Sequence, residues 1–63
     1  MSFGENLQFY RKQKNITQEQ LAEQMGVSRQ TVSKWEADSS YPEMEEILQL
    51  CDMFGCSMDT LLR

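Results

Sequence analysis

The stretch that decides the fold of this chain is TQEQLAEQMGVSRQTVSKWE, residues 17–36. Its apolar residues recur at helical spacing on both sides of a single glycine, Gly26, which predicts two short helices joined by a tight turn. Thr17, with a glutamine three residues later, has the pattern of a capping box. Ser28 is a good N-cap for the helix that follows the glycine. The stretch is therefore predicted to form a pair of consecutive helices.

The rest of the chain shows the same helical periodicity, and β-branched residues are few and scattered. Pro42 suits the start of a helix, and Gly55 suits the end of one. We therefore expect an all-α chain without a sheet, folded as one compact five-helix domain over residues 1–63. The predicted helices span approximately residues 3–14, 17–25, 28–36, 43–54 and 57–62.

Apolar residues at helical spacing predict which face of each helix is buried. Phe9 lies off the apolar stripe of the first helix, which favours exposure, and the pattern leaves open whether its ring contacts a partner. In the last helix Met58, Leu61 and Leu62 share one stripe, which we expect to dock on the domain's own core; a dimer contact is the alternative. The stripe predicted for the fourth helix consists of Met44, Ile47, Leu48, Cys51 and Phe54.

The net charge of −4 argues at first against a nucleic-acid partner, but the charge is unevenly distributed. Residues 1–35 carry five basic and three acidic side chains, a net charge of +2. Residues 36–63 carry one basic and seven acidic side chains, a net charge of −6. A polyanion is therefore expected to meet only the first half of the chain.

The composition offers no catalytic or metal-binding constellation. The chain has no histidine, and Cys51 and Cys56 alone supply neither four zinc ligands nor a C-x-x-C motif, so both are expected to be small packed hydrophobes. We expect no catalytic residue, no metal, no cofactor and no small-molecule ligand in this domain. Two thiols fit a reducing compartment, and neither a leader nor a membrane span of about 20 apolar residues is recognised. A cytoplasmic protein is expected.

The helix predicted for residues 28–36 carries long polar side chains on one side only. The side chains that fall within one arc of about 140°, at about 100° per residue, are Arg29, Gln30, Ser33 and Lys34. That arc contains no acid, and the opposite side holds the apolar residues. The competing interpretation is an ordinary solvated helix face.

The two helices of the decisive stretch are predicted to cross closely, because their connection is short and Ala22 is small where Val32 must approach. This is the geometry of a helix-turn-helix, whose second helix enters the major groove of DNA. There Arg29 is suited to guanine O6 and N7, and Gln30 to adenine N6 and N7. The polar arc therefore has the chemistry of a surface that reads base edges.

Gln18 is an amide in an unusual place. It shares its azimuth with the apolar residues of its helix, where an amide is unexpected unless that end of the helix faces a polar group. A helix N-terminus favours an anion. A phosphate is therefore predicted there, and a solvated residue at the start of a helix is the alternative.

The chain resembles the repressor and Cro type of helix-turn-helix domain, the XRE family of five-helix bacterial and phage regulators. The resemblance covers Gly4 to Leu62, almost the whole chain. Each piece of it is weak alone, but the order and spacing of the pieces are specific. The pieces are Arg11 in YRKQK, the stretch TQEQLAEQMGVSRQTVSKWE, Pro42 after the loop, and FGCSMDTLL at the end.

The resemblance implies roles for individual residues. Gln18 would contact a phosphate and brace the reading helix, and Arg11 would form an intramolecular ion pair with Glu36. Ala22, Gly26 and Val32 are expected to shape the motif. In the DNA-binding set, Arg29, Gln30 and Lys34 would face base edges. Ser33 would contact a base or a sugar, Thr31 would contact the DNA backbone, and Ser28 is included in the set without a specified contact.

The chain departs from the family pattern just after the third helix. Where the family often has a basic residue and then glycine, this chain has Ala37 and Asp38, followed by the uncharged Ser39 and Ser40. A carboxylate near phosphates repels them. This departure predicts few phosphate contacts and a modest affinity for a single domain.

We therefore expect a transcriptional regulator, in the first place a repressor, that binds double-stranded DNA sequence-specifically. Because family members usually dimerise, a homodimer is expected, with half-sites about 34 Å apart. The alternative is a protein-interaction module on the same fold, an antitoxin-like or anti-repressor partner whose acidic half meets a basic protein. The sequence leaves open whether the chain is the N-terminal part of a longer regulator.

Overall fold

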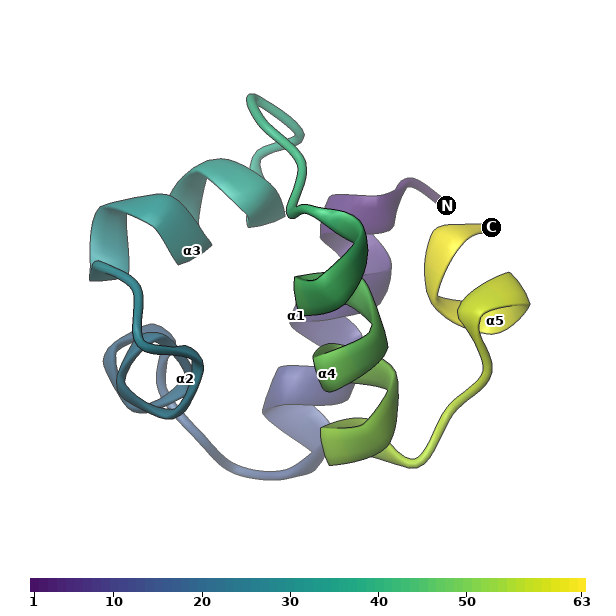
Figure 1. The fold of residues 1–63 in the computed structure, drawn as a ribbon, viewed down its shortest axis with the longest axis horizontal. Coiled ribbons are helices and arrows are strands. Elements are labelled where there is room, and N and C mark those ends of the chain that lie inside the picture. Colours follow the sequence, from purple (N-terminus) through teal and green to yellow (C-terminus); the bar gives the residue numbers. More distant parts are fainter.

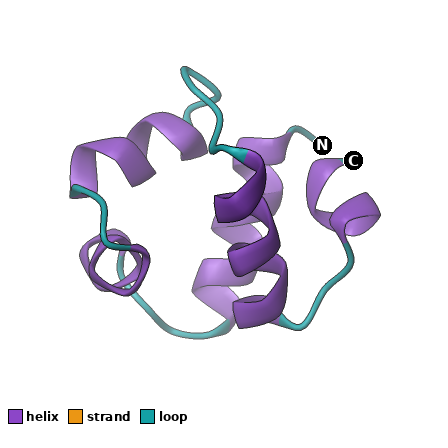
Figure 2. Cartoon of the chain, viewed as in Figure 1, coloured by secondary structure: helices purple, strands orange, loops and turns teal.

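The computed structural model describes residues 1–63 as five α-helices without a strand, and the predicted all-α fold class is confirmed (Figure 1). Figure 2 shows that only turns and loops connect the helices. The helices are α1 Phe3–Gln13, α2 Gln18–Met25, α3 Arg29–Glu36, α4 Met44–Phe54 and α5 Met58–Leu62. Helices α2 to α5 each begin one residue later than predicted, because the predicted ranges included the N-cap residue.

Side-chain caps decide where the helices begin. The hydroxyl of Thr17 accepts from the amide of Gln20 at 3.0 Å, and the Gln20 side chain accepts from the amide of Thr17 at 2.8 Å. The capping box predicted for α2 is therefore present. Ser28 accepts from the amide three residues on at 3.1 Å and caps α3. Ser2 and Glu5 form a further capping box at α1, which was not predicted although S-x-x-E is its pattern.

The helices form two groups around α1 and α4. Helices α2 and α3 lie together on one side, at the left of Figure 1, and α5 lies on the other, beside both chain ends. Helix α1 packs against both α3 and α5 and therefore connects the two groups. None of the five helices is both long and apolar enough to cross a lipid bilayer.

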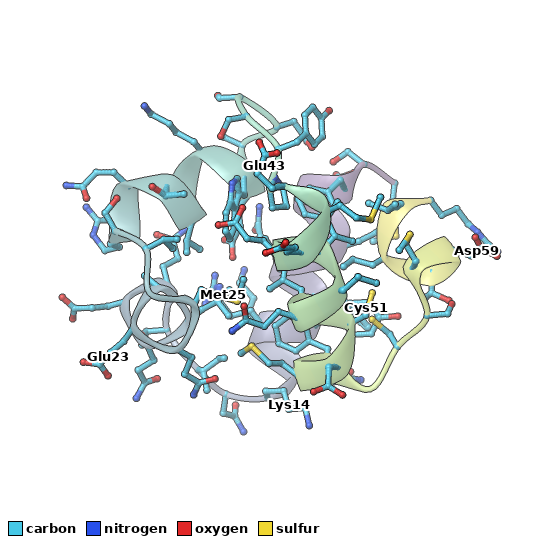
Figure 3. The ribbon with its side chains drawn as sticks, in the orientation of Figure 1. Lys14, Glu23, Met25, Glu43, Cys51 and Asp59 are labelled. Atoms are coloured by element: carbon cyan, nitrogen blue, oxygen red, sulfur yellow. The ribbon has the colours of Figure 1, made fainter.

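One apolar core joins all five helices. Figure 3 shows Met25 directed between the helices, while Glu23 on the same helix points out of the molecule. The buried apolar residues are Phe3, Leu7, Leu21, Ala22, Met25, Val32, Trp35, Ile47, Leu50, Phe54 and Leu61. Tyr10 stacks on Phe54 with ring centroids 5.9 Å apart, so an aromatic contact also links α1 to α4.

The apolar stripe predicted for α4 was partly wrong. Leu50, which the predicted stripe omitted, is fully buried, whereas Met44 and Leu48 are 57% and 52% exposed. The buried side is formed by Ile47, Leu50 and Phe54, which lie within about 60° of one another at about 100° per residue. The apolar residues of this helix fit either of two neighbouring arcs, and the packing of the other helices decides which arc is buried.

The apolar stripe of α5 docks on the domain's own core. Leu61 is fully buried and Met58 packs against the core, while Leu62 is 42% exposed. Leu61 is therefore not available for a dimer contact. Phe9 is exposed as its position off the α1 stripe favoured, and its ring packs edge-on against Tyr10 with centroids 5.3 Å apart.

Both thiols behave as small packed groups at the end of α4. Cys51 and Cys56 are free, half-buried and packed against the core, and Figure 3 shows Cys51 between α4 and α5. Burial, and to a lesser degree the neighbouring Cys51 thiol, raises the pKa of Cys56 above its ordinary value. The Cys56 thiol therefore stays protonated at neutral pH and acts as a small hydrophobe.

Asn6 is a buried polar residue, 7% exposed, whose structural part was not predicted. Its Nδ2 lies 2.9 Å from the carbonyl oxygens of Leu61 and Arg63 and 3.4 Å from that of Thr60. Carbonyl groups at the end of a helix have no partner within the helix. Asn6 therefore supplies the donor that ends α5 and ties the end of the chain to α1.

We expect Asn6→Leu to lower the free energy of unfolding by about 1–3 kcal/mol, because buried carbonyls at the end of α5 lose their donor. Urea unfolding followed by circular dichroism measures the change. Gln13→Leu, an exposed position of the same helix, serves as the control and is expected to change stability by less than about 0.5 kcal/mol. Equal stabilities of the two variants would mean that water replaces the Asn6 amide at no cost.

Candidate nucleic-acid interface

Helices α2 and α3 form a tight helical pair joined by a glycine turn. Gly26 ends α2 in the left-handed conformation, with φ of 71°, which glycine adopts without a steric penalty. The amide of Val27 then donates to the carbonyl of Ala22 at 3.0 Å, as in a Schellman motif. Ala22 and Val32 are both buried where the helices pack. The turn and the small residue together fix the direction of α3.

One side of α3 is fully occupied by the core. Val32, Trp35 and Glu36 are buried, so the helix has only one rotational setting available. On the opposite side Arg29, Gln30 and Lys34 are exposed and Ser33 is half-buried. We call these four side chains the reading face. It carries two positive charges and no acid, in a chain whose net charge is −4.

At the start of α3, the hydroxyl groups of Ser28 and Thr31 form a hydrogen bond with each other. Ser28 Oγ lies 2.9 Å from Thr31 Oγ1, and Ser28 Oγ also accepts from the Thr31 amide. Ser28 is exposed and Thr31 is half-buried. Both hydroxyls lie at the start of α3, and each has a protein partner in the structure.

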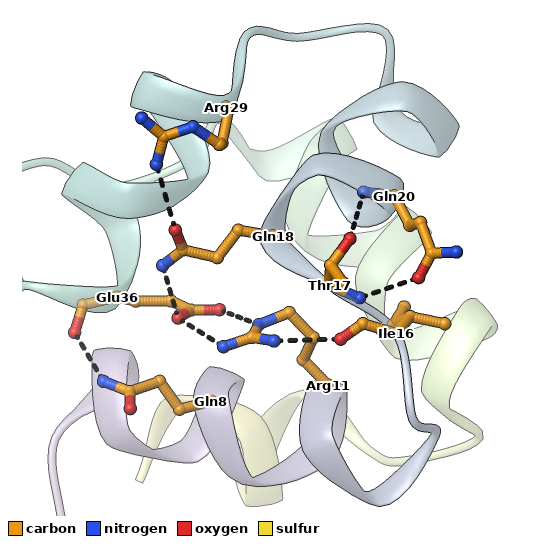
Figure 4. Close-up of polar contacts among 8 residues, drawn as sticks. All are labelled: Gln8, Arg11, Ile16, Thr17, Gln18, Gln20, Arg29 and Glu36. Atoms are coloured by element: carbon orange, nitrogen blue, oxygen red, sulfur yellow. Dashed lines mark hydrogen bonds and ion pairs between the residues drawn. The ribbon is translucent and has the colours of Figure 1, made fainter.

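A buried polar cluster, the Glu36 cluster, underlies the reading face (Figure 4). Arg11 Nε donates to Glu36 Oε2 at 2.6 Å, and Arg11 Nη2 donates to Glu36 Oε1 at 3.1 Å, so the ion pair implied by the family resemblance is present and bidentate. The Arg11 and Glu36 side chains are only 11% and 3% exposed. Arg11 Nη1 also donates to the carbonyl of Ile16 at 2.9 Å. Arg11 therefore joins α1 to α3 and to the loop before α2.

Gln18 belongs to the Glu36 cluster. Its Nε2 donates to Glu36 Oε1 at 3.0 Å, and its Oε1 accepts from Arg29 Nη1 at 3.5 Å (Figure 4). Its azimuth among apolar residues is explained by these protein partners, without the phosphate that the sequence predicted there. One N–H of the Gln18 amide has no protein partner. That hydrogen is the part of Gln18 that is free for an outside acceptor.

Asp38 is directed at α1 instead of toward solvent. With φ of 59° it takes the left-handed conformation where the family often has glycine, and its Oδ1 accepts from the amide of Gly4 at 2.8 Å. The carboxylate thus lies at the positive end of the α1 dipole, which offsets its charge. The Asp38 carboxylate is therefore expected to repel DNA phosphates less strongly than a carboxylate directed into solvent.

Gly4 and Gln8 are contacts of α1 with the end of α3 that were not predicted. A Cβ placed on Gly4 would overlap the carbonyl oxygen of Glu36 and lie 2.7 Å from its carbonyl carbon. Gln8 Nε2 donates to that same carbonyl oxygen at 3.3 Å. A glycine in the first turn of a helix was the one available indication of this close approach.

The one cavity in the surface lies near the chain ends, away from the reading face. This cavity of about 310 Å³ is lined by Met1, Asn6, Phe9, Tyr10, Thr60 and Arg63. Figure 1 shows both chain ends on the side of the molecule opposite α2 and α3. No group of three or more histidine, cysteine, aspartate or glutamate residues is placed to hold a metal ion.

Comparison with protein families identifies this pair of helices. The helix-turn-helix family model matches residues 7–61. The HTH-type transcriptional activator BcrR of Enterococcus faecalis is 50% identical over 62 residues, covering 98% of this chain and 30% of that protein. Repressor protein C2 of Salmonella phage P22 is 37% identical over 60 residues, covering 95% of this chain and 28% of that protein. The chain thus spans less than a third of the length of these two relatives.

Solved structures show the same arrangement of helices. The P22 c2 repressor, crystallised in complex with a synthetic operator, superposes with a TM-score of 0.92 at 35% identity, covering 100% of this chain and 96% of that chain. A transcriptional regulator from Listeria innocua superposes with a TM-score of 0.91 at 30% identity, covering 97% of this chain and 57% of that chain. The agreement extends over all five helices.

Proposed function

The chain belongs to the helix-turn-helix family, of the repressor or XRE type, and on this premise we propose that it binds a specific double-stranded DNA operator as part of a transcriptional regulator. In this proposal α3 lies in the major groove, which admits an α-helix. The function is binding, without a catalytic step.

The observation that carries the proposal is the reading face. Its exposed cations and amide lie on the one side of α3 that the core leaves free, and the acids of the chain are elsewhere. The reading face combines two cations and an amide without an acid, in a chain that has ten acidic and six basic residues. The similarity to the P22 c2 repressor, which was crystallised in complex with a synthetic operator, supports operator binding by this chain.

Individual roles follow from side-chain chemistry. Arg29 and Lys34 are suited to guanine O6 and N7, and Gln30 to adenine N6 and N7. The hydroxyls of Ser33, Thr31 and Ser28 are suited to sugar or phosphate oxygens beside the groove. Gln18, with one free N–H at the start of α2, is suited to a phosphate.

The regulator is proposed to act as a cytoplasmic homodimer on two half-sites about 34 Å apart. Repression is the simpler mode, because occupying an operator needs only the reading face, whereas activation needs a second contact with the transcription machinery. The alternative function, a protein-interaction module, would use the acidic half of the chain, residues 36–63.

We expect the double variant Arg29→Ala, Gln30→Ala to bind its operator at least about 100-fold more weakly than the wild-type chain, because two base contacts are lost. Fluorescence anisotropy measures the dissociation constants, on duplexes selected from a randomised pool by the wild-type chain. The wild-type affinity is expected to fall as salt rises, since counterions are released from the DNA.

The matched control is Arg63→Ala, which removes one positive charge at the opposite end of the molecule and is expected to change affinity by less than about twofold. Equal losses in both variants would mean that binding depends on net charge alone. Selection of no duplex, or binding that survives the double substitution, would contradict operator reading and favour the protein-interaction module.

A further inference from the structure

The Glu36 cluster links a buried carboxylate to an exposed arginine of the reading face through the amide of Gln18 (Figure 4). We infer that Glu36 is a positioning residue for Arg29: acting through Gln18, it directs the Arg29 guanidinium before DNA is bound. The inference rests on the proposed function for its effect on DNA, but the positioning itself is a property of the free protein.

The first step concerns the direction of the Gln18 amide. A carboxylate has no hydrogen to donate, so Glu36 can bond only the N–H end of the amide. The Gln18 Nε2 to Glu36 Oε1 distance is 3.0 Å. The carbonyl end of the amide must then point away from Glu36. Since an amide has one donor end and one acceptor end, the carboxylate fixes which end reaches Arg29.

The second step concerns the stability of that direction. Glu36 is 3% exposed, and both its oxygens are occupied by Arg11, at 2.6 and 3.1 Å. Arg11 is itself fixed by the carbonyl of Ile16. Hydrogen bonds to buried charged groups are stronger than those between neutral groups in water. The Gln18 amide is therefore held by a rigid partner although it is itself half-buried.

The third step concerns Arg29. Its Nη1 lies 3.5 Å from Gln18 Oε1, which is a long and weak hydrogen bond. An acceptor at this distance limits the directions in which the guanidinium points, yet it gives way readily to the two acceptors of a guanine edge. Less side-chain freedom remains to be lost when DNA is bound. Gln30, the neighbouring reader, is not among the hydrogen-bond partners of Gln18 or Glu36.

Positioning of Arg29 by Glu36 and Gln18 is expected to affect the recognition of one base pair only. Loss of the Gln18 amide or of the Glu36 carboxylate is expected to weaken discrimination at the base pair that Arg29 reads, while discrimination at the base pair that Gln30 reads stays intact. A general destabilisation of α3, or loss of a phosphate contact by Gln18, would lower affinity for every sequence alike. The two possibilities differ in pattern, so one set of variants separates them.

The first measurement uses the DNA-free protein. Nitrogen-15 relaxation of the Arg29 Nε–Hε group is compared among the wild-type chain, Gln18→Met and Glu36→Gln, with Gln24→Met as control. Gln24→Met makes the same replacement at an exposed position of α2. The Arg29 order parameter is expected to fall in Gln18→Met and in Glu36→Gln, since a glutamine at 36 accepts or donates and no longer fixes the amide direction.

The second measurement uses duplexes with single base-pair changes. The base pair read by Arg29 is the one at which Arg29→Ala loses discrimination, and Gln30→Ala defines the other in the same way. Gln18→Met is expected to reduce discrimination about tenfold at the Arg29 base pair and less than about twofold at the Gln30 base pair. Glu36→Gln is expected to follow the same pattern at a temperature where melting curves show it folded.

An unchanged Arg29 order parameter in Gln18→Met overturns the positioning role, whatever the DNA results. Equal loss of discrimination at both base pairs also overturns it, and so does an equal loss of affinity for every duplex, because Gln18 then acts on α3 as a whole or on a phosphate. A fall in the Arg29 order parameter in Gln18→Met but not in folded Glu36→Gln also overturns it, because Gln18 then positions Arg29 without Glu36. If the wild-type chain selects no duplex, the proposed function fails, and the relaxation measurement still decides whether Glu36 positions Arg29.

Discussion

Glu36→Ala is expected to lower the free energy of unfolding by about 3–5 kcal/mol, because it leaves the buried Arg11 guanidinium without its carboxylate partner. The side chain of Arg11 is 11% exposed and would keep only the Ile16 carbonyl as a hydrogen-bond partner. A domain of 63 residues has a total stability of only about 3–9 kcal/mol. The variant is therefore expected to lose a large part of its total stability.

Urea unfolding of both proteins, followed by circular dichroism and by the fluorescence of the single tryptophan, measures the difference. Glu23→Ala, which removes an exposed carboxylate from α2, is the control and is expected to change stability by less than about 0.5 kcal/mol. A loss of less than about 1 kcal/mol for Glu36→Ala would show that the ion pair behaves as a solvated surface pair.

The double variant Arg11→Met, Glu36→Met separates the value of the pair from the cost of a stranded charge. It is expected to lie within about 2 kcal/mol of the wild type, since apolar residues of similar volume often replace a buried ion pair at little cost. If the double variant is as unstable as Glu36→Ala, the hydrogen bonds of Glu36 to Gln18 and Arg11 are needed for folding beyond charge compensation.

Gly4→Ala is expected to destabilise the chain by about 3 kcal/mol, although alanine is the better helix former by about 1 kcal/mol. The added Cβ would overlap the Glu36 carbonyl oxygen and lie 2.9 Å from Asp38 Oδ2. This carbonyl belongs to Glu36, the last residue of α3, and the Glu36 side chain is held in the Glu36 cluster. The carbonyl therefore cannot move away from the added Cβ unless the whole helix moves. The bond from the Gly4 amide to Asp38 would be lost as well.

Thermal and urea unfolding measure the effect of Gly4→Ala. Lys12→Ala, at an exposed position of the same helix, has no such clash and is expected to stay within about 0.5 kcal/mol of the wild type. A stabilised Gly4→Ala variant would mean that helix propensity decides and that α1 moves away from α3 without cost.

The local parts of the fold were predictable because their causes are local. The helix start at Thr17, the left-handed turn at Gly26 and the N-cap at Ser28 each depend on residues within one turn of the chain. Periodicity likewise placed Val32 and Trp35 inward and the reading face outward. The Arg11–Glu36 ion pair was expected only through the family resemblance, because 25 residues separate the two in sequence.

The parts that were missed depend on how helices meet. Leu50 is buried and Leu48 exposed because α5 packs against α4 and Tyr10 of α1 stacks on Phe54, which lies on the same side of α4 as Leu50. Asn6 is structural because the end of α5 arrives beside it, 55 residues further along the chain. The direction of Asp38 toward Gly4 follows from the same meeting of α1 and α3. None of these contacts has a counterpart in local spacing.

The sequence by itself determined the helices, their caps, the turn of the helix-turn-helix and the separation of positive from negative charge, since these arise from neighbouring residues and from composition. Only the tertiary structure decided that Gln18 turns its amide toward a buried carboxylate and its carbonyl toward Arg29. The direction in which an amide group points is set by its hydrogen-bond partners. The partners of Gln18 lie on α3, while Gln18 itself lies on α2. A hydrogen-bond direction of this kind exists only once the helices are packed.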